Sequence, residues 1–272
     1  MGIPTSGCCG ISVPHTATGP PGRRIAYPLR VPTAARSSRS TRKTAAPPAA
    51  PPPSARAPAA RTKARRGTER PDVAELSRRD PVFAALAAHH DPPPVRRPVP
   101  AGQRFATLVR AICYQQLAGR AAATIHGRLV DALDGEVTPE SVIAVDAEVL
   151  RACGLSASKS ASIRDLAERV YSGEVALDRI GRLTDDEVVA HLVRVRGIGR
   201  WTAEMFLLST LARPDVWPVG DFGVRAGFAA AWHLPAVPTP LALMALGDPF
   251  RPYRSTLAWY CWRVADDRAA VH

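Results

Sequence analysis

Apolar residues recur at helical spacing along most of the chain after about residue 72. Phe105, Leu108, Val109 and Ile112, for example, fall on one face of a single helix. Alternating β-branched runs, which would predict strands, are nearly absent. The pattern therefore predicts an all-α domain over residues 71–272, large enough to bury its own core. Helices are expected over residues 81–86, 105–113, 120–133, 139–150 and 158–171. Asp80 is expected to be the N-cap of the first of these, with Pro81 in its first turn.

Two helices joined by a pair of glycines form the most informative stretch. Thr184 and Glu187 have the spacing of a capping box, which predicts a helix over residues 185–195. Gly197-Ile198-Gly199 then forms a tight hairpin, with Ile198 as its apolar plug, and a second helix begins at Arg200. Unpaired amides at such a turn bind anions. An ordinary turn between helices with a glycine C-cap is the alternative.

The net charge of +12 is carried entirely by the N-terminal quarter of the chain. Residues 1–70 hold 13 of the 36 Lys and Arg side chains and one of the 24 acidic ones, so 23 of each remain beyond them. This segment also holds 12 of the 27 prolines. Its composition predicts a disordered tail. An electrostatic arm for nucleic acid, an organellar transit peptide and translated upstream sequence without a role are the three interpretations.

Several classes of protein are excluded by composition. The chain contains no run of about 18 apolar residues, the length that a transmembrane helix requires. The cysteines lack the spacing of a disulfide scaffold, a zinc site or an iron–sulfur cluster. His126 and His191 have no partners at ligand spacing, so no metal site is expected. The five cysteines are Cys8, Cys9, Cys113, Cys153 and Cys261.

Residues 195–206 (VRGIGRWTAEMF) resemble the helix-hairpin-helix of the DNA glycosylase superfamily. Residues 215–225 (DVWPVGDFGVR) resemble the Gly/Pro-rich loop and catalytic aspartate that follow it. With further matches in the same order, the chain is similar to the alkylation-repair branch, DNA-3-methyladenine glycosylase II. The resemblance implies two helical subdomains with the active-site cleft between them. The further matches are at residues 115–117, 154–159 and 252–262.

Two departures from neighbouring branches refine this resemblance. Bifunctional relatives carry a hairpin lysine that forms a Schiff base, whereas Trp201 stands at that position here. Their iron–sulfur cluster needs four cysteines after the catalytic loop, and only Cys261 occurs there. The resemblance therefore implies a monofunctional glycosylase without a cluster.

The implied reaction is hydrolysis of the N-glycosidic bond of an alkylated purine. A base methylated on ring N3 or N7 is cationic and leaves readily, so the barrier lies in the oxocarbenium-like sugar. One carboxylate near C1′ can stabilise that cation or orient the attacking water. Asp221 matches the family's catalytic aspartate, with a turn or N-cap role as its competing interpretation. Asp215 is the rival, and its position just after Pro214 suits a turn.

Recognition of such a base requires an aromatic slot, because the target atoms are stacked inside the duplex. A cationic purine suits an electron-rich ring. Trp201 and Trp262 match the family's pocket tryptophans, and Tyr114 and Phe222 are candidate walls. Trp259, three residues before Trp262, is expected to be a core residue.

DNA contacts are expected at three places. The space left by the flipped base needs a wedge, and Gln116 or Leu117 matches that region of the family. Gln115 has an inter-helix hydrogen bond as its alternative role. The remaining expected DNA-binding residues are Gly197, Ile198, Gly199, Arg200, Thr202, Ser158 and Lys159. The resemblance also implies a monovalent cation held by hairpin carbonyls.

The resemblance thus implies a monofunctional enzyme that releases 3-methyladenine, and 7-methylguanine in addition, from duplex DNA. Release of 3-methyladenine alone, or of hypoxanthine and ethenoadenine as well, are the alternative substrate ranges. A non-catalytic module that binds damaged DNA through the hairpin is the alternative, and a bifunctional lyase is disfavoured by the missing lysine. The expected partner is double-stranded DNA containing alkylated bases, with no membrane and a monomeric protein. The expected location is the cytoplasm, at the nucleoid in a bacterium, unless the tail directs the chain to an organelle.

Overall fold

The computed structural model describes residues 70–117 and 119–270. Within this part of the chain every regular element is a helix, which confirms the predicted all-α class. None of these helices is both long and apolar enough to cross a membrane. The tail predicted over residues 1–70 lies, apart from Arg70, outside the described residues. The elements are α1 (Pro71–Arg79), α2 (Pro81–His89), η1 (Ala101–Gln103), α3 (Arg104–Tyr114), α4 (Gly119–Ala132), α5 (Pro139–Ala144), α6 (Ala147–Ala152), α7 (Ala157–Tyr171), η2 (Ile180–Arg182), α8 (Asp185–Leu192), α9 (Arg200–Ser209), α10 (Phe222–Ala231), α11 (Pro240–Leu246), η3 (Asp248–Phe250) and α12 (Arg254–Ala270).

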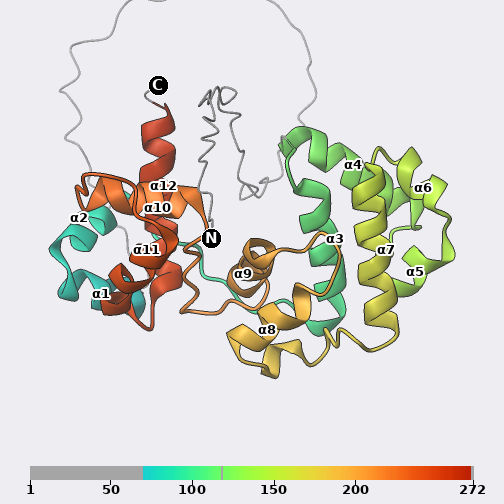
Figure 1. The fold of residues 1–272 in the computed structure, drawn as a ribbon, viewed down its shortest axis with the longest axis horizontal. Helices are drawn as coiled ribbons and strands as arrows, with labels where there is room; N and C mark the ends of the chain where they lie inside the picture. The colour runs from blue at the N-terminus through green and yellow to red at the C-terminus, as the bar shows by residue number, and fades with distance from the viewer. Residues whose placement is uncertain (1–69, 118, 271–272) are drawn as a thin grey trace, which may run out of the picture.

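The helices form two subdomains, each around its own hydrophobic core. The first core joins residues of α3 through α9, including Ile112, Ile163 and Phe206. In the second, α1 and α2 pack with α10, α11 and α12, and the Phe83 and Tyr260 rings meet edge to face with centroids 4.9 Å apart. Figure 1 shows α3 through α7 at one end and the second group at the other, with α8 and α9 of the first group nearest the second. The chain therefore leaves the second subdomain after α2 and returns to it at α10.

Helix starts follow the capping chemistry expected from the sequence. The Asp80 carboxylate accepts a hydrogen bond from the Phe83 amide at 2.7 Å, at the start of α2. Thr184 and Glu187 form both bonds of the capping box that begins α8. Each side chain satisfies an amide that would otherwise have no partner in the first turn. These two predictions are confirmed.

Two expected helices differ from the prediction. The helix expected over residues 139–150 is divided into α5 and α6, because Val145 is extended and its carbonyl accepts a hydrogen bond from Arg164 of α7 instead. The helix expected over residues 185–195 ends at Leu192, and Val195 turns into the first core with 1% of its surface exposed. In both places tertiary contacts override local helix propensity.

Gly227→Ala should destabilise the second subdomain, where α10 and α12 cross closely. A Cβ at Gly227 would lie 1.9 Å from the Cys261 carbonyl oxygen of α12, a backbone atom that cannot turn away. We expect the free energy of unfolding to fall by about 2–3 kcal/mol, as for other overpacked sites. Gly127→Ala is the control, because a Cβ there meets no atom within 4 Å and should stabilise α4 by about 0.5–1 kcal/mol. Denaturant titration measures both, and equal effects would contradict the close approach.

Candidate active site

The hairpin between α8 and α9 is fixed against α7. The Asp165 carboxylate accepts a hydrogen bond from the Arg196 amide at 2.7 Å. Gly197 has a φ of 75°, and a Cβ there would lie 2.4 Å from the Ser162 hydroxyl, so both conformation and space require glycine. Ile198 is 3% exposed and packs into the first core, where it acts as the predicted plug. The side chains thus hold the hairpin from inside and leave its backbone as the outer surface.

The start of α9 supplies donors for an anion. Gly199 is its N-cap residue and carries no side chain to occupy the first-turn amides, and open space surrounds it. Arg200 follows with a side chain that is 65% exposed. Thr202 is buried, and its hydroxyl accepts a hydrogen bond from the Gln115 amide at 3.4 Å. For Thr202, only the main-chain amide is left for the DNA contact predicted from the sequence.

Asp221 is a buried carboxylate that accepts three hydrogen bonds. It is the N-cap of α10 and accepts from the Val224 amide at 2.9 Å. The Trp262 indole of α12 donates to the same oxygen, Oδ1, at 3.0 Å. The Trp201 indole of α9 donates to Oδ2 at 2.7 Å. Because α9 belongs to the first subdomain and α10 and α12 to the second, this carboxylate lies where the two meet.

The two tryptophans differ in how far they are open to solvent. Trp262 is 6% exposed, so its indole orients Asp221 from inside the second core. Trp201 is 37% exposed, and Phe222, directly after Asp221, is 64% exposed. The Arg225 guanidinium lies 5.6 Å from the centre of the Phe222 ring. Exposed aromatic surface therefore flanks a buried acceptor, as a slot for a flat cationic base would require.

Glu204 is a second buried carboxylate, which the sequence interpretation missed. It lies one turn after Trp201 on α9, and Arg200 donates to it at 2.9 Å. Burial raises the pKa of Glu204, Arg200 opposes that shift, and the nearby charge of Asp221 adds to it. Burial and the same charge also raise the pKa of the Cys261 thiol. The only sequence signal for Glu204 was its position four residues after Arg200, which suits a helical ion pair.

The rival aspartate, Asp215, is engaged in an ion-pair network. Arg254 donates two hydrogen bonds of 2.8 Å to Asp215, one to each carboxylate oxygen. The Arg254 side chain is 9% exposed. Arg251 adds a third contact at 3.0 Å. Further along the same loop, the Trp217 indole donates to the Leu243 carbonyl at 2.8 Å. Asp215 therefore anchors the loop that leads to Asp221.

The other predicted aromatic residues lie in packed surroundings. The Arg110 guanidinium lies 4.3 Å from the centre of the Tyr114 ring, and the His126 ring meets Tyr114 edge on with centroids 6.4 Å apart. Trp259 donates its indole N–H to the Asp91 carbonyl at 3.2 Å, on the same helix as Trp262. The role of Tyr114 as a pocket wall stays a prediction, because its described ring contacts are with Arg110 and His126.

The predicted contacts beyond the hairpin divide into exposed and occupied groups. Ser158 is exposed in the first turn of α7, and Gln116 is exposed after α3, whereas Leu117 is half-buried. The Lys159 ammonium instead donates to the main-chain carbonyls of Cys113 and Gln115. The structure thus gives Lys159 a role within the protein, and its phosphate contact stays a prediction.

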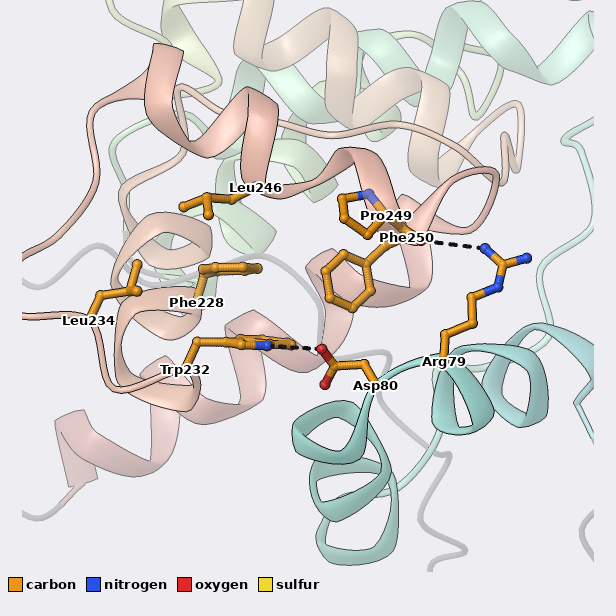
Figure 2. Close-up of a pocket in the computed structure, with 8 residues that line it drawn as sticks. All are labelled: Arg79, Asp80, Phe228, Trp232, Leu234, Leu246, Pro249 and Phe250. Atoms are coloured by element: carbon orange, nitrogen blue, oxygen red, sulfur yellow. Dashed lines mark hydrogen bonds between the residues drawn. The ribbon is translucent and has the colours of Figure 1, made fainter.

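A separate apolar cavity of about 240 Å³ lies within the second subdomain (Figure 2). The Phe228 and Trp232 rings stack in it with centroids 4.2 Å apart, and the Trp232 indole donates to Asp80 at 3.2 Å. None of the residues that accept from or donate to Asp221 lines this cavity. The candidate site is therefore the surroundings of Asp221 and not the cavity.

The family model for the HhH-GPD superfamily base excision DNA repair proteins matches residues 109–252. The chain belongs to this family. The match includes the hairpin, Trp201 and Asp221, so the residues brought together by the fold lie within the segment that defines the family.

This HhH-GPD protein has curated relatives among the alkylation-repair glycosylases. It is 36% identical over 164 residues to DNA-3-methyladenine glycosylase 1 of Schizosaccharomyces pombe. The aligned segment covers 59% of this chain and 72% of the relative. It is 37% identical over 138 residues to the DNA-3-methyladenine glycosylase of Saccharomyces cerevisiae, covering 46% and 45% of the two chains.

Solved structures of the same family share the fold. The S. pombe 3-methyladenine DNA glycosylase in complex with abasic DNA matches with a TM-score of 0.61 and 33% identity, over 71% of this chain and 95% of that one. The DNA-3-methyladenine glycosidase of Bacillus halodurans matches with a TM-score of 0.66 and 31% identity, over 75% and 93%. The two-subdomain arrangement implied by the resemblance is therefore that of this HhH-GPD protein.

Proposed function

We propose that the protein is a monofunctional DNA glycosylase that releases 3-methyladenine, and 7-methylguanine in addition, from duplex DNA. The observation that carries this proposal is the Asp221 carboxylate, held by the indoles of Trp201 and Trp262 beside exposed aromatic surface. The relatives named as DNA-3-methyladenine glycosylases support the same substrate class.

The chemistry follows from the charge of the methylated base. The N-glycosidic bond breaks with its electron pair going to the base, which leaves as a neutral purine, and the sugar carries the positive charge at C1′. Asp221 stabilises that charge through space. Water then adds its oxygen to C1′ and gives up a proton to the surrounding solvent, which completes the hydrolysis. No acid is needed to protonate the leaving group, so one carboxylate is sufficient.

Trp201 also distinguishes this enzyme from a lyase. A lyase of this superfamily would use a hairpin lysine to attack C1′ and cut the strand. An indole cannot form a Schiff base, and at this position it donates to Asp221. The proposed product is therefore an intact strand with an abasic site, which breaks only after treatment with alkali.

The direct test is mass analysis of the bases that the purified protein releases from DNA treated with a methylating agent. We expect 3-methyladenine and 7-methylguanine, with strand breaks only after added alkali. Specific binding to abasic DNA without any free base would favour the alternative, a non-catalytic module that binds damaged DNA. Strand cleavage without alkali would contradict the monofunctional mechanism.

Trp262→Phe should slow base release about tenfold at saturating enzyme. The substitution keeps the aromatic ring and removes the N–H that orients Asp221, and a hydrogen bond to a charged group contributes about 1.5–3 kcal/mol. Trp259→Phe is the matched control, because the same change on the same helix removes only a bond to the Asp91 carbonyl. Single-turnover kinetics measure both variants. Equal rates for the two would mean that the Trp262 donor is not needed.

We further propose that a monovalent cation binds at the hairpin, held by its main-chain carbonyls. Neutral carbonyl oxygens suit such an ion, and Gly197 and Gly199 of the hairpin are exposed. The Gly197 carbonyl already accepts one hydrogen bond, from Gln115, which leaves it one lone pair. A bound cation would supply positive charge beside a DNA phosphate. A rise in thermal stability with potassium, absent with choline at equal ionic strength, would support this proposal.

A further inference from the structure

The turn of residues 115–117 and the hairpin are distant in sequence but bonded to each other. The Gln115 side-chain amide donates to the Gly197 carbonyl at 3.0 Å and to the Thr202 hydroxyl at 3.4 Å. One side chain thereby connects the end of α3 to the hairpin backbone and to the first turn of α9. A carboxylate at this position could donate neither bond and would repel the Gly197 carbonyl.

Lys159 holds the same turn from the other side. Its ammonium donates to the carbonyls of Cys113 and Gln115, at 2.9 and 2.7 Å. These carbonyls belong to the last turn of α3 and to its C-cap residue, where helical partners are missing. Burial of the side chain lowers the pKa of Lys159. Gln115 is therefore bonded through its side chain to the hairpin and through its main chain to α7.

The same helix, α7, also supports the hairpin. Lys159 lies near its start, and Asp165, further along it, accepts the Arg196 amide at 2.7 Å. The turn and the hairpin are thus joined twice, once directly through Gln115 and once through α7. Such a closed set of contacts leaves the two segments little freedom to move relative to each other.

The turn itself adopts a costly conformation. Gln116 has a φ of 56° although it is not a glycine, and its side chain is exposed. Such a conformation costs on the order of 1–3 kcal/mol and persists only where its surroundings enforce it. The bonds of Gln115 and Lys159 on the preceding residue provide that enforcement. They hold Gln116 and Leu117 at a fixed place beside the hairpin.

We propose that Gln115 and Lys159 are positioning residues that lock the turn of residues 115–117 to the hairpin, so that phosphate binding and base extrusion occur on one rigid unit. The proposal rests on the proposed function, since it concerns how the duplex is opened. Neither residue touches the base. Each acts through the position of Gln116 and Leu117, which enter the stack while the hairpin amides hold the backbone.

The experiment compares Gln115→Met, Gln115→Glu and Lys159→Met with the wild type. Arg164→Met is the matched control, because Arg164 also lies on α7 and donates to a helix-end carbonyl, that of Val145, away from the turn. Three quantities are measured: affinity for undamaged duplex, fluorescence of 2-aminopurine next to an abasic site, and single-turnover release of 3-methyladenine. Gln115→Glu changes no residue of α7, so this variant still tests the positioning role even if Lys159→Met lowers stability.

We expect the three turn variants to lose the 2-aminopurine signal and to release base about tenfold more slowly, with duplex affinity within about twofold of wild type. Arg164→Met should match the wild type in all three measurements. If Lys159 contacts a phosphate directly, Lys159→Met will instead weaken binding to undamaged duplex, reduce its salt slope by about 0.9 and leave the fluorescence intact. That result, or wild-type release by the variants, would overturn the proposal.

The proposed glycosylase function and the proposed positioning role of Gln115 and Lys159 would fail in different ways. If the wild type releases no base, the proposed function is wrong, and the fluorescence measurement still tests whether Gln115 and Lys159 control unstacking. If the wild type releases base and the turn variants equal it, only the positioning role is wrong.

Discussion

Asp221→Asn should lower the single-turnover rate of base release by about 10²–10³-fold while leaving duplex affinity within about twofold. Loss of one preorganised electrostatic group has effects of this size in other enzymes. The oxygen of the asparagine side chain can still accept the hydrogen bonds from the Val224 amide and the Trp262 indole. Its NH₂ group would then face the Trp201 indole N–H, donor against donor, in place of the present 2.7 Å bond. The hairpin, where the phosphate contacts are expected, is not changed.

The control for Asp221→Asn is Asp248→Asn, which removes a carboxylate charge from an exposed ion pair with Arg251. Its release rate should equal that of the wild type. Methylated DNA with a radiolabelled methyl group gives the rate directly. If Asp221→Asn retains more than about a tenth of the wild-type rate, its negative charge is not what stabilises the sugar cation.

Asp215→Ala should have the opposite phenotype, with a large loss of stability and an unchanged rate per folded molecule. The substitution leaves the buried Arg254 guanidinium without its carboxylate, and breaking such a pair costs about 3–5 kcal/mol. For a domain of this size the melting temperature should fall by about 10 °C. Calorimetry measures the loss, and active-site titration corrects the rate for the folded fraction.

Asp178→Ala tests whether the effect of Asp215→Ala depends on burial. Asp178 pairs with Arg179 where both side chains are about 70% exposed. Such pairs contribute at most about 1 kcal/mol, so the melting temperature should hardly change. If Asp215→Ala melted normally but released no base, the catalytic carboxylate would be Asp215.

The features predicted correctly from the sequence depend on neighbouring residues. The capping box of Thr184 and Glu187 needs a spacing of three, and the Asp80 cap is followed directly by a proline in the first turn of α2. The tight hairpin follows from two glycines around Ile198. Local geometry determines each of these features, so each can be predicted from this one sequence.

The features that were missed depend on residues distant in the chain. Val145 leaves its expected helix because Arg164 of α7 takes its carbonyl. Trp201 and Trp262 were expected to act through their ring faces, but their indole N–H groups meet at Asp221 only after the subdomains pack. The bonds from the Lys159 ammonium to the carbonyls of Cys113 and Gln115 were likewise not foreseen, and its phosphate contact stays a prediction. No local pattern specifies such contacts.

Because α10, α11 and α12 pack against α1 and α2, the two cores become complete at different times during synthesis of the chain. Helices α3 through α9 are continuous in sequence, so their core can form as soon as they leave the ribosome. The other core needs α1 and α2 together with α10 through α12, and α12 is the last helix described. Asp221 gains the Trp262 donor only when α12 has been synthesised. The scaffold that would grip DNA therefore precedes the chemistry during biosynthesis, and a nascent chain would be able to hold DNA before it could excise a base.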